Sequence, residues 1–273
     1  MKMSLLTIVR GRKTAIHNMI KALNINGRFP DEVIVVHMNE DIYHLTNDKF
    51  PIREYSLLSD HALPLAEARN YAARQASYHQ LIFLDADCMP AADFLEAYEK
   101  AFSENEALVS GRVAYLPLSA MSAPDLLLNM EQYGIADPVR GKLDQYPYYL
   151  FWSLNFGCSK KNFEKIGGFD ESFTGYGAED TDFGFSAHQQ EVDFLTIDAW
   201  AYHQYHQSYD PPVNHLQAIV QNATTFREKW GSWPMEGWLN KFQSMGYVEF
   251  TADKLQIIRL PDHKQIASAL KST

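Results

Sequence analysis

Residues 81–87 read LIFLDAD, an apolar run that ends in two carboxylates, Asp85 and Asp87. Four consecutive apolar residues without polar alternation predict a strand that is buried on both faces, as in a parallel sheet. Residues 32–37 (EVIVVH) form a second run of this kind, and residues 5–9 (LLTIV) form a third. The three runs predict neighbouring strands of one buried sheet.

Helical patterns lie between and after these runs. Residues 14–23 carry apolar side chains at helical spacing, residues 65–77 are rich in Ala, and Asp93 is placed to cap a helix that runs to about Phe102. Strands that alternate with helices predict an α/β fold, a mostly parallel sheet flanked by helices. Further along the chain, we expect a helix over residues 213–230 and an edge strand within residues 251–260.

Polar clusters follow the predicted strands at their carboxyl ends, where ligands bind in such sheets. They are Arg10 with Arg12, residues 39–41, and Asp85 with Asp87. Two carboxylates one residue apart on a turn can both reach a hard divalent cation, which in turn can hold a diphosphate. The alternative for this D-x-D triplet is a solvated loop whose acids cap a helix.

Two later motifs also offer chemistry. Residues 177–182 (GAEDTD) place three carboxylates within four positions, which repel one another unless a cation lies nearby or one of them is protonated. They are either a general base with an acceptor-binding acid, or a solvated helix start where acids are favoured by the dipole. Residues 201–206 (AYHQYH) supply imidazoles, which are either Mn²⁺ ligands or structural side chains.

In their order, the strings FLDADC, GGFDESFTGYGAEDTDFG and AYHQ resemble the metal-dependent GT-A glycosyltransferases. The similarity is to the family 2 type with a galactosyltransferase-like carboxyl-terminal segment, as in β-1,4-galactosyltransferases and chondroitin-type polymerases. It covers roughly residues 4–210. The resemblance implies a GT-A fold, a UDP-sugar donor, Mn²⁺ or Mg²⁺, and a saccharide or glycoconjugate acceptor. The implied reaction is the inverting transfer of a hexosyl unit in glycan or polysaccharide synthesis.

The resemblance also implies a role for each matching position. Asp180 would be the catalytic base, and Glu179 would hold sugar hydroxyls. Asp87 and His203 would bind the metal, with Asp85 as a further ligand and His206 as the reserve candidate. Arg69 would meet the uridine or the diphosphate. The remaining positions expected to hold the nucleoside are Thr7, Arg10, Asn39 and Asp41.

We expect a single GT-A domain over residues 1–273. Residues 1–115 would bind nucleotide and metal, residues 116–212 would bind acceptor, and residues 213–273 would form an extension. Aromatic side chains between residues 133 and 152 are either a sugar-stacking platform or core. Three rival functions stay open: a retaining transferase, a nucleotidyltransferase, and a nucleotide-sugar-binding protein without turnover.

Composition excludes several classes of protein. The chain has 24 basic and 34 acidic residues, a net charge of −10, which disfavours binding to nucleic acid through bulk electrostatics. Its two cysteines, Cys88 and Cys158, cannot form a disulfide framework and predict free thiols. We see no signal peptide and no apolar run of about 18 residues, so we expect no membrane span. The expected location is the cytoplasm, with peripheral contact to the inner membrane face as an option.

Overall fold

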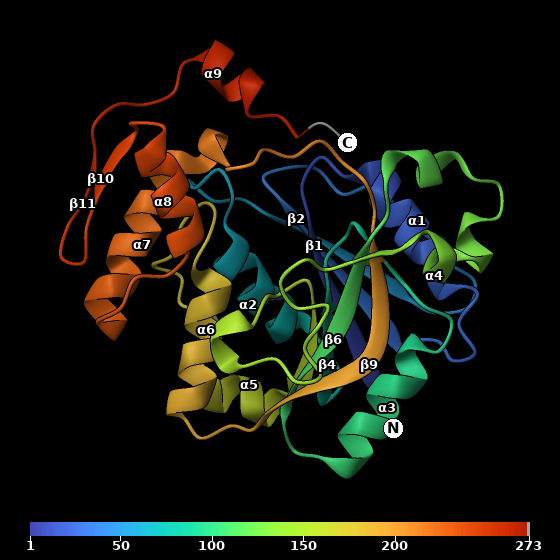
Figure 1. Cartoon of the computed structure of the whole chain (residues 1–273). Helices are drawn as coiled ribbons and strands as arrows, with labels where there is room; N and C mark the ends of the chain where they lie inside the picture. The colour runs from blue at the N-terminus through green and yellow to red at the C-terminus, as the bar shows by residue number, and fades with distance from the viewer. Residues whose placement is uncertain (272–273) are drawn as a thin grey trace.

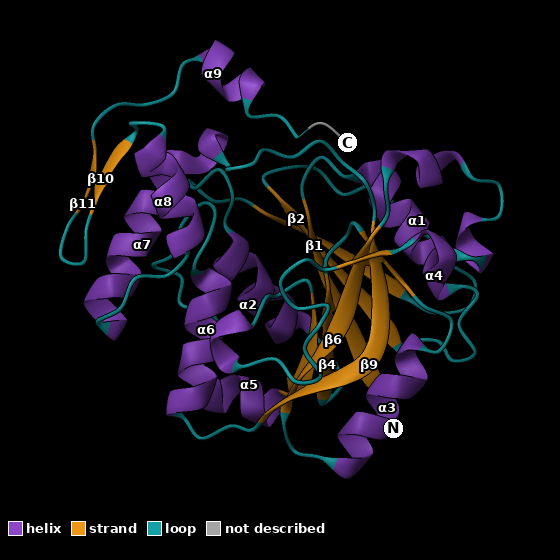
Figure 2. Ribbon diagram, viewed as in Figure 1, coloured by secondary structure: helices purple, strands orange, loops and turns teal. Residues whose placement is uncertain are grey.

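The computed structural model describes residues 1–271. A nine-stranded sheet runs through its centre in the order β3-β2-β1-β4-β8-β6-β9-β5, and β7 pairs with β6 (Figures 1 and 2). The strands are β1 (Met3–Val9), β2 (Glu32–Met38), β3 (Ile52–Leu57), β4 (Gln80–Leu84), β5 (Cys88–Pro90), β6 (Leu108–Tyr115), β7 (Ile135–Ala136), β8 (Asn155–Ser159) and β9 (Phe194–His203).

The sheet combines parallel and antiparallel pairings. Strands β3, β2, β1 and β4 pair in parallel, as do β6 and β9, and these pairings involve most of the paired residues. Strand β8 is antiparallel to both of its neighbours, and β5 and β7 are antiparallel additions at β9 and β6. The expected α/β fold with a mostly parallel sheet is therefore confirmed.

Helices cover both faces of the sheet. One apolar cluster joins the sheet to α1 (Lys13–Leu23) and α3 (Phe94–Glu104). A second joins its other face to α2 (Leu65–Gln75), α5 (Lys160–Ile166) and α6 (Glu179–Gln189). Every residue of β1, β2 and β4 is buried as a result, which explains why these strands read as continuous apolar runs.

The carboxyl-terminal residues form a third packed unit beside α6, drawn in orange and red in Figure 1. It comprises α7 (Leu216–Trp230), α8 (Glu236–Ser244), the antiparallel pair β10 (Val248–Phe250) and β11 (Leu255–Ile257), and α9 (His263–Ser268). Between β6 and β8 the chain is mostly irregular, with short 3₁₀ turns and α4 (Met130–Tyr133). Within residues 1–271, no helix is both long enough and apolar enough to cross a bilayer.

Most expected strands and helices form within a few residues of their predicted bounds, but two expectations need correction. Asp93 occupies the N-cap position of α3, yet its side chain makes no capping hydrogen bond. Residues 251–260 do not add an edge strand to the main sheet, because only Leu255–Ile257 is extended and it pairs with β10. Both cysteines are free and buried, as expected.

Several strands had no clear sequence signal. Strand β6 carries Ser110, Gly111 and Arg112 in its centre, which interrupt the apolar run, and its pairing with β9 is irregular there. A Cβ atom on Gly111 would collide with the Asn155 side chain and with the carbonyl of Ala199. The glycine is therefore required by the close approach of β8 and β9, which only the folded sheet reveals.

Candidate functional site

The D-x-D triplet forms a turn at the carboxyl end of β4. The backbone N–H of Asp85 donates to the carbonyl of Leu154 at 2.9 Å, and the N–H of Cys88 donates back to the carbonyl of Asp85 at 2.8 Å. Strand β5 starts at once and pairs with β9, so that Cys88 lies opposite His203. This register brings the triplet next to the end of β9, more than a hundred residues away in the sequence.

Asp87, His203 and His206 gather in one place. Nε2 of His203 lies 3.4 Å from Oδ1 of Asp87, and Nε2 of His206 lies 3.5 Å from Oδ2. Their three potential ligand atoms all lie within 4.8 Å of one another. Burial lowers the pKa of His203, so its imidazole is neutral near pH 7 and has a lone pair available for a metal. The expected and the reserve histidine therefore both lie beside Asp87.

Asp85, expected as a further metal ligand, is directed instead toward Arg69 of α2. Arg69 is 5% exposed and bridges two carboxylates, with Nη2 at 3.5 Å from Oδ1 of Asp85 and Nη1 at 3.2 Å from Oε1 of Glu179. Burial raises the pKa of Asp85 to about 6, although the Arg69 charge opposes the shift. Burial and the Asp180 charge together raise the pKa of Glu179 to about 7. The bridge thus ties the D-x-D turn to the first residue of α6.

Asp180 is the more accessible carboxylate of the acidic pair. Glu179 is 6% exposed and engaged by Arg69, whereas Asp180 is half-buried. One oxygen of Asp180, Oδ1, accepts a hydrogen bond of 2.7 Å from the N–H of Thr181. Burial raises the pKa of Asp180 against the opposing charge of Arg69. A half-buried carboxylate with a raised pKa is suited to accept a proton.

Tyr176 lies close to these acids and had not been singled out from the sequence. Burial, followed by four carboxylates, raises the pKa of its phenol to about 12. The carboxylates are Glu179, Asp180, Asp85 and Asp87. Tyr176 therefore lies within electrostatic reach of both the D-x-D turn and the start of α6. The aromatic ring of Tyr176 stacks on His215 at 4.6 Å between centroids.

Residues expected at the nucleoside occupy varied environments. Thr7 is 2% exposed in the middle of β1, so its side chain belongs to the interior of the sheet and not to an open surface. Arg10 donates to the carbonyl of Ala62, and Asn39 donates to the carbonyl of His61 at 2.8 Å. Arg10 and Asn39 therefore hold the loop that precedes α2. Asp41 is exposed.

Two further residues approach Asp87, Arg12 from the loop before α1 and Gln204 from the end of β9. Nε of Arg12 lies 3.9 Å from Oδ2 of Asp87. The backbone N–H of Gln204 donates to the carbonyl of Asp87 at 2.7 Å, while its side chain donates to the carbonyl of Ala15 at 2.9 Å. A cavity of about 330 Å³ lies between the start of α1, Asp87 and His206. The sequence pointed to Arg12 through its Arg-Gly-Arg motif, whereas Gln204 lay within the AYHQ string without a predicted role.

Asp182 faces away from this site. It is 1% exposed, and its Oδ1 accepts a hydrogen bond of 2.7 Å from Nε1 of Trp230 and lies 2.8 Å from Nζ of Lys229. Of the three carboxylates in the GAEDTD motif, two therefore belong to the site and one anchors α7. Among the aromatic residues considered as a sugar platform, Tyr146 and Phe151 are buried core, whereas Tyr149 is 54% exposed.

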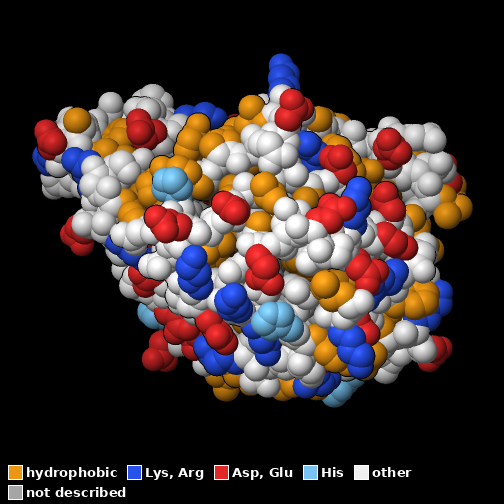
Figure 3. Space-filling view, turned by 90° about the horizontal axis from the view of Figure 1, so that it is seen from below, with side chains coloured by type: hydrophobic (Ala, Val, Ile, Leu, Met, Phe, Trp, Pro, Cys, Tyr) orange, Lys and Arg blue, Asp and Glu red, His pale blue; other side chains and the backbone are white. Residues whose placement is uncertain are grey.

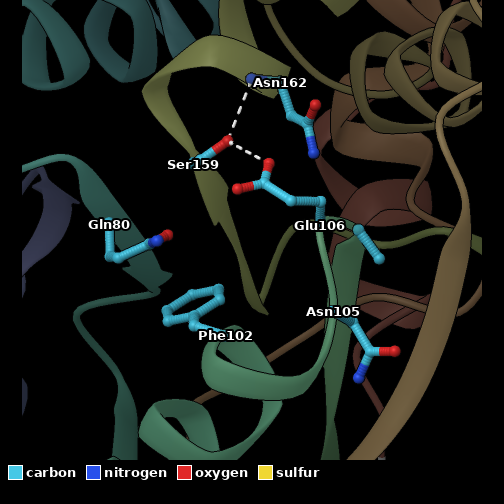
Figure 4. Close-up of a pocket in the computed structure, with 7 residues that line it drawn as sticks. Gln80, Phe102, Asn105, Glu106, Ser159 and Asn162 are labelled. Carbon is cyan, nitrogen blue, oxygen red and sulfur yellow. Dashed lines mark hydrogen bonds between the residues drawn. The ribbon is translucent and has the colours of Figure 1, made fainter. Parts of the chain in front are cut away.

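A second, smaller hollow lies at the opposite end of β4 and is shown in Figure 4. There the Ser159 hydroxyl accepts from the N–H of Asn162, as the cap of α5, and contacts Glu106 at 3.5 Å. The capping role explains this cluster without a ligand. The face seen in Figure 3 carries acidic and basic side chains interspersed, with no basic patch of the kind that binds nucleic acid.

Comparisons with known proteins give one family and one fold. The family described as "Glycosyltransferase like family 2" matches residues 8–195. Chondroitin synthase of Escherichia coli is 26% identical over 55% of this chain and 26% of its own length. Hyaluronan synthase of Pasteurella multocida is 27% identical over 67% of this chain and 22% of its own length. The chain thus spans about a quarter of these two relatives.

Solved structures share the fold at low identity. S. aureus TarS in complex with UDP has a TM-score of 0.54 at 16% identity, covering 83% of this chain and 66% of that one. GalNAc-T7 with UDP, GalNAc and Mn²⁺ has a TM-score of 0.55 at 12% identity, covering 89% and 57%. These likenesses confirm the expected GT-A fold. Because the family match covers well over half of the sequence, the chain belongs to glycosyltransferase family 2.

Proposed function

We propose that this protein transfers a hexosyl unit from a UDP-sugar to a hydroxyl group of a saccharide or glycoconjugate, with a divalent metal and with inversion. The observation that carries the proposal is the meeting of Asp87, His203 and His206 at the sheet edge beside the Arg69 bridge and Asp180. Structural neighbours crystallised with UDP, and one of them with Mn²⁺, support the choice of donor and metal.

The residues around Asp87 fit a divalent cation. They offer one carboxylate oxygen and two imidazole nitrogens from three positions within 4.8 Å of one another. A mixed oxygen and nitrogen set favours Mn²⁺ over Mg²⁺, which prefers oxygen ligands. When bound, such a cation offsets the negative charge of a diphosphate leaving group. Arg12, whose Nε lies 3.9 Å from Asp87, adds a positive charge from the protein itself.

Asp180 is the proposed general base. Its carboxylate takes the proton of the acceptor hydroxyl while the hydroxyl oxygen forms a bond to the anomeric carbon. The bond between that carbon and the diphosphate oxygen breaks, and UDP leaves with the electron pair. Attack from the face opposite the leaving group inverts the anomeric configuration. Glu179, held by Arg69, lies next to this base and is proposed to bind sugar hydroxyls.

In this proposal, residues 1–115 hold the nucleotide and supply Asp87 to the metal. Residues 116–212 hold the acceptor and also supply His203 and His206 to the metal, and residues 213–273 form an extension. We also propose a role in glycan or polysaccharide synthesis, because two relatives are named chondroitin synthase and hyaluronan synthase. The alternative function, a nucleotide-sugar-binding protein without turnover, is disfavoured because the side chains proposed for metal binding and catalysis are all present. They are Asp85, Asp87, Glu179, Asp180 and His203.

The test is a UDP-release assay over a panel of UDP-sugars, with Mn²⁺ and with EDTA, in the presence of mono- and oligosaccharide acceptors. We expect release from at least one donor with Mn²⁺ and none with EDTA. NMR of the product's anomeric proton distinguishes inversion from retention. UDP binding without release from any donor would favour the rival of an inactive binding protein.

A further inference from the structure

The segment that leads into the acidic pair has an unusual backbone. Within residues 173–178, which we call the acid loop, Gly175, Gly177 and Ala178 have positive φ angles of 80°, 95° and 72°. Ala178 is a non-glycine residue in the left-handed region. This backbone conformation costs free energy, which contacts with the surrounding structure must offset. The next two residues are Glu179 and Asp180. The position of the proposed base therefore depends on what holds this loop.

Helix α7 packs along the acid loop, and Asn222 is its central contact. Asn222 is 1% exposed, and its Nδ2 donates to the carbonyls of Thr174 at 3.0 Å and Gly177 at 2.8 Å, with the carbonyl of Tyr176 at 3.5 Å. A single side-chain amide thus contacts three of the loop's six carbonyl groups.

The rest of the same helix face holds the two ends of the loop. Lys229 lies 2.7 Å from Asp170 before the loop and 2.8 Å from Asp182 after it. Between them, Phe226 packs against Phe173 and Ala178 in one apolar cluster. Contacts at the start, middle and end come from residues three to seven positions apart on α7. Figure 1 shows this helix running alongside α6.

We propose that Asn222 is a positioning residue, which sets the place of the Glu179 and Asp180 carboxylates by holding the acid loop through its carbonyl groups. Helix α7 lies outside residues 8–195, the part of the chain that matches the family, so the family match assigns it no role. The effect on turnover rests on the proposed function, whereas the effect on the loop does not.

The test compares Asn222→Leu, which keeps the branched shape and removes the donor, with Val220→Ala. Val220 is a buried residue of the same helix that belongs to the carboxyl-terminal apolar cluster, so its variant matches a loss of helix packing without touching the loop's carbonyls. Asn222→Ser, which retains one donor, serves if the leucine variant does not fold. Hydrogen exchange of peptides covering residues 171–182 is measured for each, together with kcat, KM and calorimetric binding of UDP with Mn²⁺.

For Asn222→Leu, we expect exchange in the acid loop to rise about tenfold and kcat to fall roughly 10- to 100-fold. The Kd of UDP should stay within about twofold of wild type, since the metal-binding side chains are untouched. Asn222→Ser should give loop exchange and kcat values between those of the wild type and Asn222→Leu. Val220→Ala should change neither the loop exchange nor kcat. Unchanged exchange in Asn222→Leu, or an equal kcat loss in Val220→Ala, would overturn the inference. If the wild type releases no UDP, the proposed function fails, and loop exchange alone decides the inference.

Discussion

Asp180 and Asp182 lie two residues apart on α6, and the same Asp→Asn change should affect turnover at one position and stability at the other. Asp180→Asn keeps the shape of the side chain and removes its basicity. We expect turnover to fall by about 10²-fold or more, the range for loss of a general base. Because burial raises the pKa of Asp180, a neutral amide avoids the cost of a buried charge, and Tm should stay level or rise.

Asp182→Asn should act on stability instead. The carboxylate is paired with Lys229 and accepts from Trp230, and charge-assisted hydrogen bonds of this kind contribute about 1.5–3 kcal/mol. Two facts reduce the expected loss: burial raises the pKa of Asp182, and Lys229 keeps Asp170 as a partner. We therefore expect a loss of about 1–2 kcal/mol, a fall in Tm of roughly 2–8 °C, and a turnover loss under about tenfold.

The assay is UDP release with Mn²⁺, from whichever donor the wild type consumes, with Tm measured on the same preparations. An active Asp180→Asn enzyme would remove the proposed mechanism. If instead both variants kept near-normal turnover and changed stability by only about 0.3–1 kcal/mol, the two acids would act only by stabilising the start of α6 through the helix dipole.

Calorimetry of UDP should show Kd at least about tenfold weaker in EDTA than in Mn²⁺, and His203→Ala should abolish the difference; equal wild-type affinities would exclude the metal site. Arg69→Ala should weaken UDP binding by about 1–3 kcal/mol, with Arg69→Lys retaining part of it; an unchanged Kd in a folded variant would reject that role. Burial and the Asp180 charge raise the pKa of Glu179 from 4.5 to about 7. Between these two values the native state binds more protons than the unfolded state. The stability of the metal-free protein should therefore fall as pH rises from about 4.5 to 7. Glu179→Gln should flatten the decline in Tm between about pH 4.5 and 7, and parallel pH profiles of the two proteins would contradict the assignment.

The sequence alone determined the layered fold and its first strands. The buried parallel strands had to be continuous apolar runs, because helices cover both of their faces, so LIFL and EVIVV could be recognised without tertiary information. The family strings, which lie on local turns, likewise predicted site roles for Asp85, Asp87, Glu179 and Asp180.

Only the tertiary structure decided which of these side chains meet. The pairing of β5 with β9 brings both His203 and His206 to Asp87, and the burial of Arg69 turns Asp85 toward Glu179. Asn222, for which the sequence predicted no role, donates to the carbonyls of Thr174 and Gly177 in the acid loop. Such contacts join residues tens to more than a hundred positions apart, and they depend on strand register and helix packing. Local residue patterns do not predict which distant residues meet, because register and packing are fixed by the burial of the whole core.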